Sequence, residues 1–426
     1  MHEGIATLGP ETLEAAVRSR FADDPDWLRA RRLELAAAAL ERELPQRPHT
    51  PLKSRRLDRI PVLAAGDTSP ALPEIGVEGA AGLLVVADGR PLRSWLDPAL
   101  APQGVVFTTL SQAAREAPGL VMRFLGRSAD DTADRLAALN GTLWDGGAFL
   151  YVPPGVEIPG LFVVLYLTGD STPGSFPRTL AVLDRGARAT LVERFQGGGS
   201  GRTLFSATSE VFLEEAAALT MGSLQQLAGG VEAFLRRAAT LNADATLDWS
   251  IGEFGAGLVV TGHQVRLTAP GARAATTTVF FGSGRQHQDY RAEVEHLAPH
   301  TASTMVARGV VKDKARTAFY GVSHIHAGAK GADARQKEQI LMLNDGARAD
   351  AVPALLIDEN DVFAAHSASA GPVDRQALYY LMARGLSEEQ AVRLYVHGFL
   401  APVIDTIGDP WLRARVWEEA EGKMLT

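Results

Sequence analysis

The sequence predicts a mainly β protein in which a right-handed parallel β-helix is flanked by N-terminal and C-terminal helical domains. Three observations support this fold class. From about residue 156 to 350, short β-rich segments alternate with turns of Gly, Asn and Asp. A turn of small residues recurs in this region at intervals of about 28 residues. Helical spacing of apolar residues is found mainly outside it, towards the two ends of the chain.

The recurring turn stands just ahead of a β-rich segment each time it appears. Its copies are residues 186–189, 215–218, 242–245, 271–274, 300–303 and 328–331. A constant period in a β-rich region is typical of a solenoid, because one coil cannot bury its own apolar face whereas stacked coils share a core. The next similar turn, at residues 345–347, follows after a shorter interval, so the repeat is expected to break there. A β-sandwich or barrel is the alternative, which the constant period disfavours.

Residues 1–80 are predicted to form an N-terminal helical region with a Pro-rich linker. Apolar residues at helical spacing indicate helices over about residues 10–21 and 25–44. The pair Asp24-Pro25 is a favourable start signal for the second helix. Residues 45–75 are rich in proline and are therefore expected to be irregular.

The β-helix core is predicted over residues 81–358 and begins with an α/β lead-in that extends to about residue 138. The pattern favours a strand at residues 82–88 and a helix at residues 130–140. Residues 230–242 are a candidate helix within the β-rich region. The strands expected in the core include residues 161–167, 179–183, 189–195, 258–267 and 274–281.

Residues 359–426 are predicted to form a C-terminal helical domain. Asp374 can cap the start of a first short helix, because its side chain can accept hydrogen bonds from free backbone amides. Ser387 can cap a second one, with a glutamine three residues later at the spacing of a capping box. The expected helices cover residues 374–384 and 387–400.

Composition excludes several classes of function. The net charge of −8 argues against a nucleic-acid surface, which needs a basic patch. No apolar run reaches the length of a membrane-spanning helix, so no membrane partner is expected. The N-terminus lacks the order of a signal peptide, which favours a cytoplasmic protein. Cysteine is absent, so the chain has no thiolate of the kind that normally holds an iron–sulfur cluster.

Three histidines are candidate metal ligands. His366 has small, uncharged neighbours, and its imidazole could bind a metal through a neutral nitrogen. The alternative is an ordinary surface histidine in a loop. His324 and His326 are two residues apart, so both side chains would point to the same side of a strand. They could bind a metal together, or they could belong to a polar face of the solenoid.

The motifs of several enzyme classes are missing. The sequence contains no Walker-type phosphate-binding loop, no G-x-S-x-G and no H-E-x-x-H. The chain is therefore not expected to hydrolyse nucleotide through a Walker-type loop, and we predict that it is not an enzyme. The alternative is an extracellular-type β-helix polysaccharide lyase or hydrolase, which would require a carboxylate cluster in a groove. Glu293 and Glu295 alternate on a strand face, yet no clear Asp cluster stands beside them.

The stretch from Asp361 to Leu400 resembles the C-terminal signature of the SufB/SufD family of iron–sulfur cluster assembly proteins. The matching positions are Asp361-Val362, His366, Gly371, residues 378–386, Ala391 and Gly398-Phe399. The likeness is long and ordered, and it covers about residues 139–426. One position departs from the family pattern, because Ala364 stands where a cysteine is often found.

Two further motifs of the β-rich region are similar to the family. They are residues 286–289 and Glu295-His296, which we expect to serve packing and hydrogen bonds at the turns of the coils. Residues 329–336 resemble a third segment, with Lys330 in place of a glutamine, and a structural role is expected there too.

The resemblance implies a SufD-type subunit of the SUF iron–sulfur cluster assembly complex. Such a subunit is a non-catalytic scaffold for cluster assembly and iron acquisition. The SufD type is favoured over the SufB type because the SufB-type chain relies on cysteine. The implied partners are a SufB-type chain and a SufC-type ABC ATPase, and a homodimer is an alternative assembly.

The resemblance also implies roles for individual residues. His366 would lie at the interface with the SufB-type chain, where a transient iron–sulfur cluster is built. No cofactor is expected to be bound tightly by this chain alone. The two C-terminal helices would bind the ATPase, with Tyr380, Arg384, Arg393 and Phe399 as contact residues.

Overall fold

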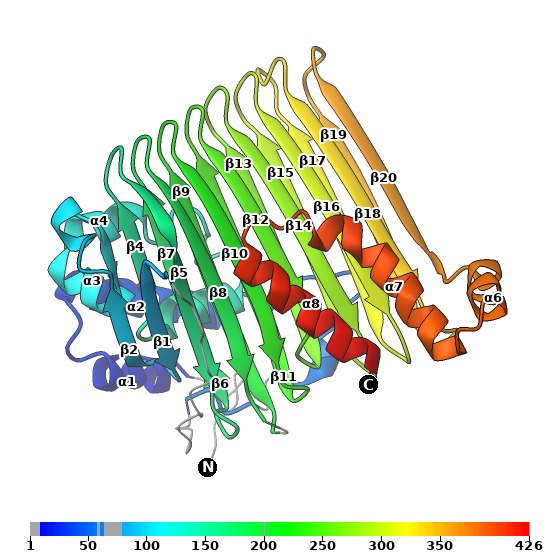
Figure 1. The fold of residues 1–426 in the computed structure, drawn as a ribbon. Helices are drawn as coiled ribbons and strands as arrows, with labels where there is room; N and C mark the ends of the chain where they lie inside the picture. The colour runs from blue at the N-terminus through cyan, green and yellow to red at the C-terminus, as the bar shows by residue number, and fades with distance from the viewer. Residues whose placement is uncertain (1–8, 58–59, 64–78, 200, 426) are drawn as a thin grey trace.

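The computed structural model of the chain describes residues 9–57, 60–63, 79–199 and 201–425. Two ten-stranded sheets face one another along a β-helix, and helices lie at both ends of the chain (Figure 1). The predicted fold class, a mainly β protein with a β-helix core and terminal helices, is confirmed. Within the described ranges, no helix combines the length and the apolar composition needed to cross a membrane.

We call the two sheets A and B. In spatial order, sheet A contains β2 (Arg90–Leu96), β1 (Gly82–Ala87), β5 (Glu157–Thr168), β8 (Arg188–Gly197), β10 (Ala218–Leu227), β12 (Thr246–Glu253), β14 (Arg273–Gly282), β16 (Ala302–Val311), β18 (Asp333–Met342) and β20 (Phe363–Pro372). Sheet B contains β19 (Arg348–Ile357), β17 (Arg316–Ile325), β15 (His287–His296), β13 (Leu258–Leu267), β11 (Val231–Leu241), β9 (Thr203–Leu213), β7 (Arg178–Leu183), β4 (Ala148–Val152) and β3 (Val106–Thr108), and β6 (Gly174–Ser175) pairs with β9. Neighbouring strands of the coils are parallel within each sheet. Along the chain, successive strands of the coils belong alternately to sheet A and to sheet B.

The recurring turn of the sequence forms the corner that leads from sheet B to sheet A. At each corner a residue with positive φ precedes a buried Ala or Thr; these residues are Gly186, Ala216, Asp244, Gly271, His300 and Gly331. The backbone N–H of each corner donates to a carbonyl of the equivalent corner in the next coil, for example from Ala216 to Ala243 at 2.8 Å. Small residues recur because the corners stack on one another at close range.

The solenoid extends beyond its predicted boundary at residue 358. Residues 345–347 do not break the repeat, since they lie at the opposite corner, between β18 and β19. Strand β20, which falls in the predicted helical domain, pairs in parallel with β18, and the Gly331 N–H donates to the carbonyl of Asp361 at 2.7 Å. The Ala- and Ser-rich sequence of β20 lacks the apolar alternation of a strand, because its side chains do not face a further coil.

Residues 230–242, the candidate helix of the β-rich region, form strand β11. The expectation of a helix there is wrong for a physical reason. Arg237 points into the space between the sheets, where it pairs with Glu253 at 2.9 Å, and this inward charge hides the alternation of the strand.

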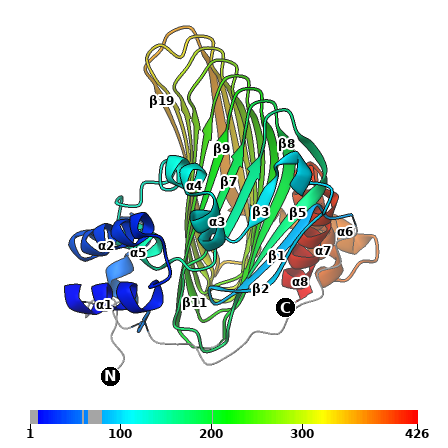
Figure 2. The same cartoon turned by 90° about the vertical axis from the view of Figure 1, so that its left-hand side faces the viewer.

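The N-terminal helices α1 (Pro10–Arg20) and α2 (Asp26–Glu41) agree with the predicted ones. Helix α2 packs on α5 (Arg135–Leu143), which lies against β9 on the outer face of sheet B (Figure 2). The remaining short helices are η2 (Leu52–Arg55), η4 (Ala101–Gln103), α3 (Leu110–Glu116) and α4 (Pro118–Phe124). Much of the predicted Pro-rich linker, including Pro70 and Pro73, lies outside the described residues.

The C-terminal helices are α6 (Arg375–Ala383), α7 (Glu388–Ile404) and α8 (Pro410–Leu425). Both predicted caps are present: Asp374 accepts from two backbone amides, and Ser387 forms a capping box. Helices α7 and α8 lie across the outer face of sheet A, whereas α6 lies beside the last coils (Figure 1). Helix α8 falls in the predicted helical domain but has no counterpart among the two predicted helices.

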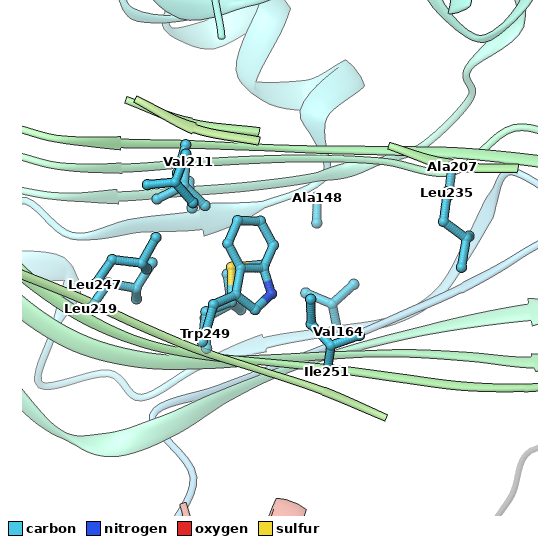
Figure 3. Close-up of a cluster of buried hydrophobic side chains, with 14 of the residues drawn as sticks. Ala148, Val164, Ala207, Val211, Leu219, Leu235, Leu247, Trp249 and Ile251 are labelled. Carbon is cyan, nitrogen blue, oxygen red and sulfur yellow. The ribbon is translucent and has the colours of Figure 1, made fainter. Parts of the chain in front are cut away.

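The space between the two sheets, which we call the lumen, holds the main core. Apolar side chains from both sheets meet there around the ring of Trp249, which is fully buried (Figure 3). Polar side chains also point into the lumen, and their distribution along the β-helix defines the candidate site.

Candidate functional site

His366 lies at the end of the lumen. It is on β20, an outermost strand of sheet A, and stands in register with Gln336 of β18. Residues paired in register in a parallel sheet point to the same side, so His366 faces the lumen like Gln336. The imidazole is exposed, because β20 is the last strand of the sheet at this end. Ala364, at the position of the family cysteine, faces the same way.

Two polar side chains are buried one coil further in. Gln336 and Glu338 are two residues apart on β18, with exposed fractions of 4% and 1%. The Gln336 amide nitrogen donates to Ser323 Oγ at 2.6 Å and to the Ala354 carbonyl at 3.2 Å. Burial raises the pKa of Glu338 to about 7. No local motif marks Glu338, although Gln336 belongs to a segment that resembles the family.

The middle of the lumen is a second polar region. Glu193 is fully buried and accepts hydrogen bonds from Thr179, Ser209 and Ser223 at 2.7–3.0 Å. Ser223 in turn accepts from the indole N–H of Trp249 at 3.0 Å. Hydroxyl groups from several coils therefore solvate this carboxylate.

Arg237 and His263 extend this middle region. Arg237 pairs with Glu253, and both are almost completely buried. His263 packs edge-on against Trp249 with ring centroids 4.8 Å apart. Burial, together with the nearby charge of Arg237, lowers the pKa of His263 to about 3, so its imidazole is neutral.

His324 and His326 lie on the outside of sheet B, away from the lumen-facing His366. Their rings stack with centroids 3.7 Å apart, although β17 ends at Ile325 and His326 lies just beyond the strand. His324 Nε2 contacts Asp358 Oδ2 at 3.0 Å, and His326 Nε2 lies 3.4 Å from Glu295 Oε2. In the part of the chain that the structure describes, no group of three or more His, Cys, Asp or Glu side chains could hold a metal. Metal binding by this pair stays a prediction.

The matched motifs of the β-rich region form packing and corner contacts, as predicted. The Gln286 side chain donates to the carbonyls of Gly255 and Ala256 at 3.0 and 2.7 Å. His296 is buried, and its two ring nitrogens contact the hydroxyls of Thr301 and Ser303 at 2.8 Å each.

The four residues predicted on the C-terminal helices have different surroundings. Tyr380 and Arg384 lie on α6, where the guanidinium stacks 4.9 Å from the ring centroid and Tyr380 is 58% exposed. Arg393 lies on α7 and approaches Glu421 of α8 at 4.0 Å. Phe399 is half-buried beneath Arg308 of β16, so it attaches α7 to the sheet.

Comparison with known proteins matches two consecutive parts of the chain to known families. Residues 166–399 match the family described as "SUF system FeS cluster assembly, SufBD core domain". Residues 81–161 match the family described as "SufBD protein N-terminal region".

Individual relatives come from both branches of this family. The chain is 32% identical to the iron–sulfur cluster assembly protein SufD of Bacillus subtilis (strain 168), over 90% of this chain and 91% of that protein. It is 28% identical to SufB of the same organism, over 78% of this chain and 71% of that protein. An iron–sulfur cluster assembly SufBD family protein of Staphylococcus epidermidis is 27% identical over the same shares.

Proposed function

Because the chain belongs to the SufBD family of iron–sulfur cluster assembly proteins, we propose that it is the SufD-type, non-catalytic scaffold subunit of a cytoplasmic SUF complex. The observation that carries this proposal is the likeness to SufD, which extends over nine-tenths of both chains, whereas the likeness to SufB is lower and shorter. The family assignment favours this role over a polysaccharide lyase or hydrolase.

The absence of cysteine supports the scaffold role. Thiolates are the usual ligands of iron–sulfur clusters, and this chain supplies none. A cluster assembled with its help therefore takes its thiolates from another chain. The cluster is cargo of the complex and is not held tightly by this chain alone.

The open end of the β-helix is the surface that we assign to a SufB-type partner. Strands β19 and β20 are the outermost strands of their sheets, and an unpaired edge is a ready template for another chain. Large apolar side chains are exposed on these two strands: Val352, Leu356, Ile357 and Phe363. In this arrangement His366 lies beside the interface and contributes an imidazole to the transient cluster. A second copy of this chain is the alternative occupant.

The exposed side of α6 and the adjoining part of α7 are the surface that we assign to a SufC-type ABC ATPase. Tyr379, Tyr380 and Leu394 are 76%, 58% and 51% exposed, which is unusual for such large side chains. Arg384 and Arg393 add positive charge beside them. Phe399 packs between this surface and sheet A, and it does not line the surface itself.

Co-purification of the tagged chain from its native host tests the proposal. We expect a SufB-type chain and a SufC-type ATPase, identified by mass, to be recovered with it. Recovery of the chain as a homodimer alone would contradict the heteromeric assembly. In the reconstituted complex, His366→Ala should slow cluster delivery, and normal delivery by this variant would exclude a required role for the imidazole.

Charge reversal tests the ATPase surface separately. Arg384→Glu and Arg393→Glu should weaken ATPase binding while the β-helix stays folded. Arg18→Glu, an exposed charge on α1 at the other end of the chain, serves as the matched control. Unchanged binding in both C-terminal variants would place the ATPase elsewhere.

A further inference from the structure

Three buried acceptor oxygens near the open end of the lumen have no hydrogen-bond donor. They are Gln336 Oε1 and both carboxylate oxygens of Glu338, and none of them has a partner among the described residues. The side chains are at least nine-tenths buried. No neighbouring charge contributes to the shifted pKa of Glu338, since burial is its only cause.

Buried oxygens without donors destabilise the folded protein unless another interaction compensates for the lost hydration. An ionised carboxylate taken out of water without a partner loses several kcal/mol, and a buried amide oxygen without a donor adds to the loss. Two things can relieve it: a proton on Glu338, or a cation between the oxygens. A proton would leave at least one of the three oxygens without a donor, whereas a cation would attract all of them.

The oxygens come together where Gly321 leaves space. Gly321 lies on β17, across the lumen, and a methyl group at its Cα would collide with Glu338 Oε1. The same methyl group would lie 3.2 Å from Gln336 Oε1. Both oxygens therefore approach one point, and the lack of a side chain at residue 321 makes their approach possible.

We propose that Glu338 and Gln336 bind a divalent cation of the class of Mn²⁺ and Fe²⁺ inside the last coils of the β-helix. Carboxylate and amide oxygens are ligands of hard divalent ions. The imidazole of His366, in register with Gln336, lies at the mouth of this site and favours a transition metal over Ca²⁺ or Mg²⁺. Three other lumen-facing residues of β20, Ala364, Ala368 and Ala370, are small and leave the end of the lumen accessible. This inference goes beyond the proposed function, because it requires only this chain.

The test is a titration of the full chain, first freed of metal by a chelator, with Mn²⁺ followed by electron paramagnetic resonance. We expect saturable binding of one ion per chain. Glu338→Gln should weaken it by at least roughly tenfold, and Gln336→Glu should strengthen it, because the second carboxylate adds charge to the site. The same series with Fe²⁺ under anaerobic conditions should give the same ranking.

Glu293→Gln, on the outer face of sheet B, is the matched control and should bind as the parent chain does. Melting temperature gives a second readout, because a ligand that binds only the folded state raises it. Mn²⁺ should raise it in the parent chain but not in Glu338→Gln. If Glu338→Gln does not fold, Gln336→Leu decides the question in the same way. Equal affinities for the parent chain and the lumenal variants, or no stoichiometric binding, would overturn the site. Neither result would bear on the SufD-type assignment.

Discussion

The middle and the open end of the lumen contain the same kinds of buried polar groups in opposite surroundings. In the middle, Glu193 accepts from three hydroxyls and Glu253 pairs with Arg237. Near the open end, Glu338 is just as buried but has neither a hydroxyl nor a counter-charge. Among the described residues, buried polar atoms without a hydrogen-bond partner occur in both regions, on Arg237, Glu253 and His263 in the middle as well as on Glu338. The two regions differ in that the middle contains a counter-charge and hydroxyl donors for its carboxylates, whereas Glu338 has neither.

Breaking the ion pair of the middle should have the largest effect. Arg237→Met leaves Glu253 as a buried charge without its partner, which should lower the free energy of unfolding by about 3–5 kcal/mol. Chemical denaturation measures this loss. Arg335→Met, an exposed arginine on β18, should change it by less than about 0.5 kcal/mol. Similar losses of unfolding free energy in the two variants would show that the stability of the middle does not depend on this ion pair.

At the open end, removal of a charge should instead stabilise the metal-free protein. The folded pKa of Glu338, about 7, lies above its ordinary value of 4.5. The folded state therefore binds the proton more tightly, and this group lowers stability as pH rises from about 4.5 to 7, by about 3 kcal/mol in all. Glu338→Gln should remove that dependence and be the more stable protein at pH 8. Parallel unfolding curves for both proteins from pH 4.5 to 8 would contradict this expectation.

Two lumenal serines allow the same substitution in both regions. Ser223→Ala removes a donor to Glu193 and leaves the Trp249 N–H unpaired, so it should lower the free energy of unfolding by about 1.5–3 kcal/mol. Ser323→Ala leaves Gln336 with its bond to the Ala354 carbonyl, so about 0.5–1 kcal/mol is expected. Thermal unfolding of both variants gives the comparison. A larger loss at Ser323 would mean that the open end also relies on its own polar contacts.

One group of the middle, His263, should contribute a smaller pH response of opposite sign to that of Glu338. His263 has a folded pKa of about 3, below its ordinary value of 6.5, so the unfolded chain binds its proton more readily. This group therefore lowers stability as pH falls below 6.5, by about 1.4 kcal/mol at pH 5.5. Denaturation of the parent chain and of His263→Gln at pH 8 and 5.5 isolates the contribution. If the variant retains the full acid sensitivity, His263 is not its source.

Sequence patterns located the repeating parts of the fold better than its ends. The corners were recognisable because Ala187 and Ala272 must be small where coils stack. Strand β20 was not, because a last strand has no further coil to dictate its apolar residues. The sequence of strand β11 resembles that of a helix because Arg237 faces inward.

The candidate site could likewise be predicted from the sequence only in part. His366 can be singled out from a local motif, and its role stays a prediction. Glu338 was missed because its importance depends on which residues neighbouring coils bring together. The signal was nonetheless present: Gln336 and His366 are about one coil apart in the sequence, and that spacing places them side by side.

The C-terminal helices have a mechanical consequence. Gln226 of β10 bonds to Glu419 of α8 at 2.5 Å, Lys423 bonds to Ser283 and Gln286 at 3.0 Å, and Arg308 of β16 bonds to the backbone of Phe399 on α7. These bonds connect the C-terminal helices to several coils, from the middle of the β-helix to its last coils. A force applied to α6 is therefore distributed over these coils, and β20 does not bear it alone. Such a force would move the β-helix as a rigid body and would not detach its last strand.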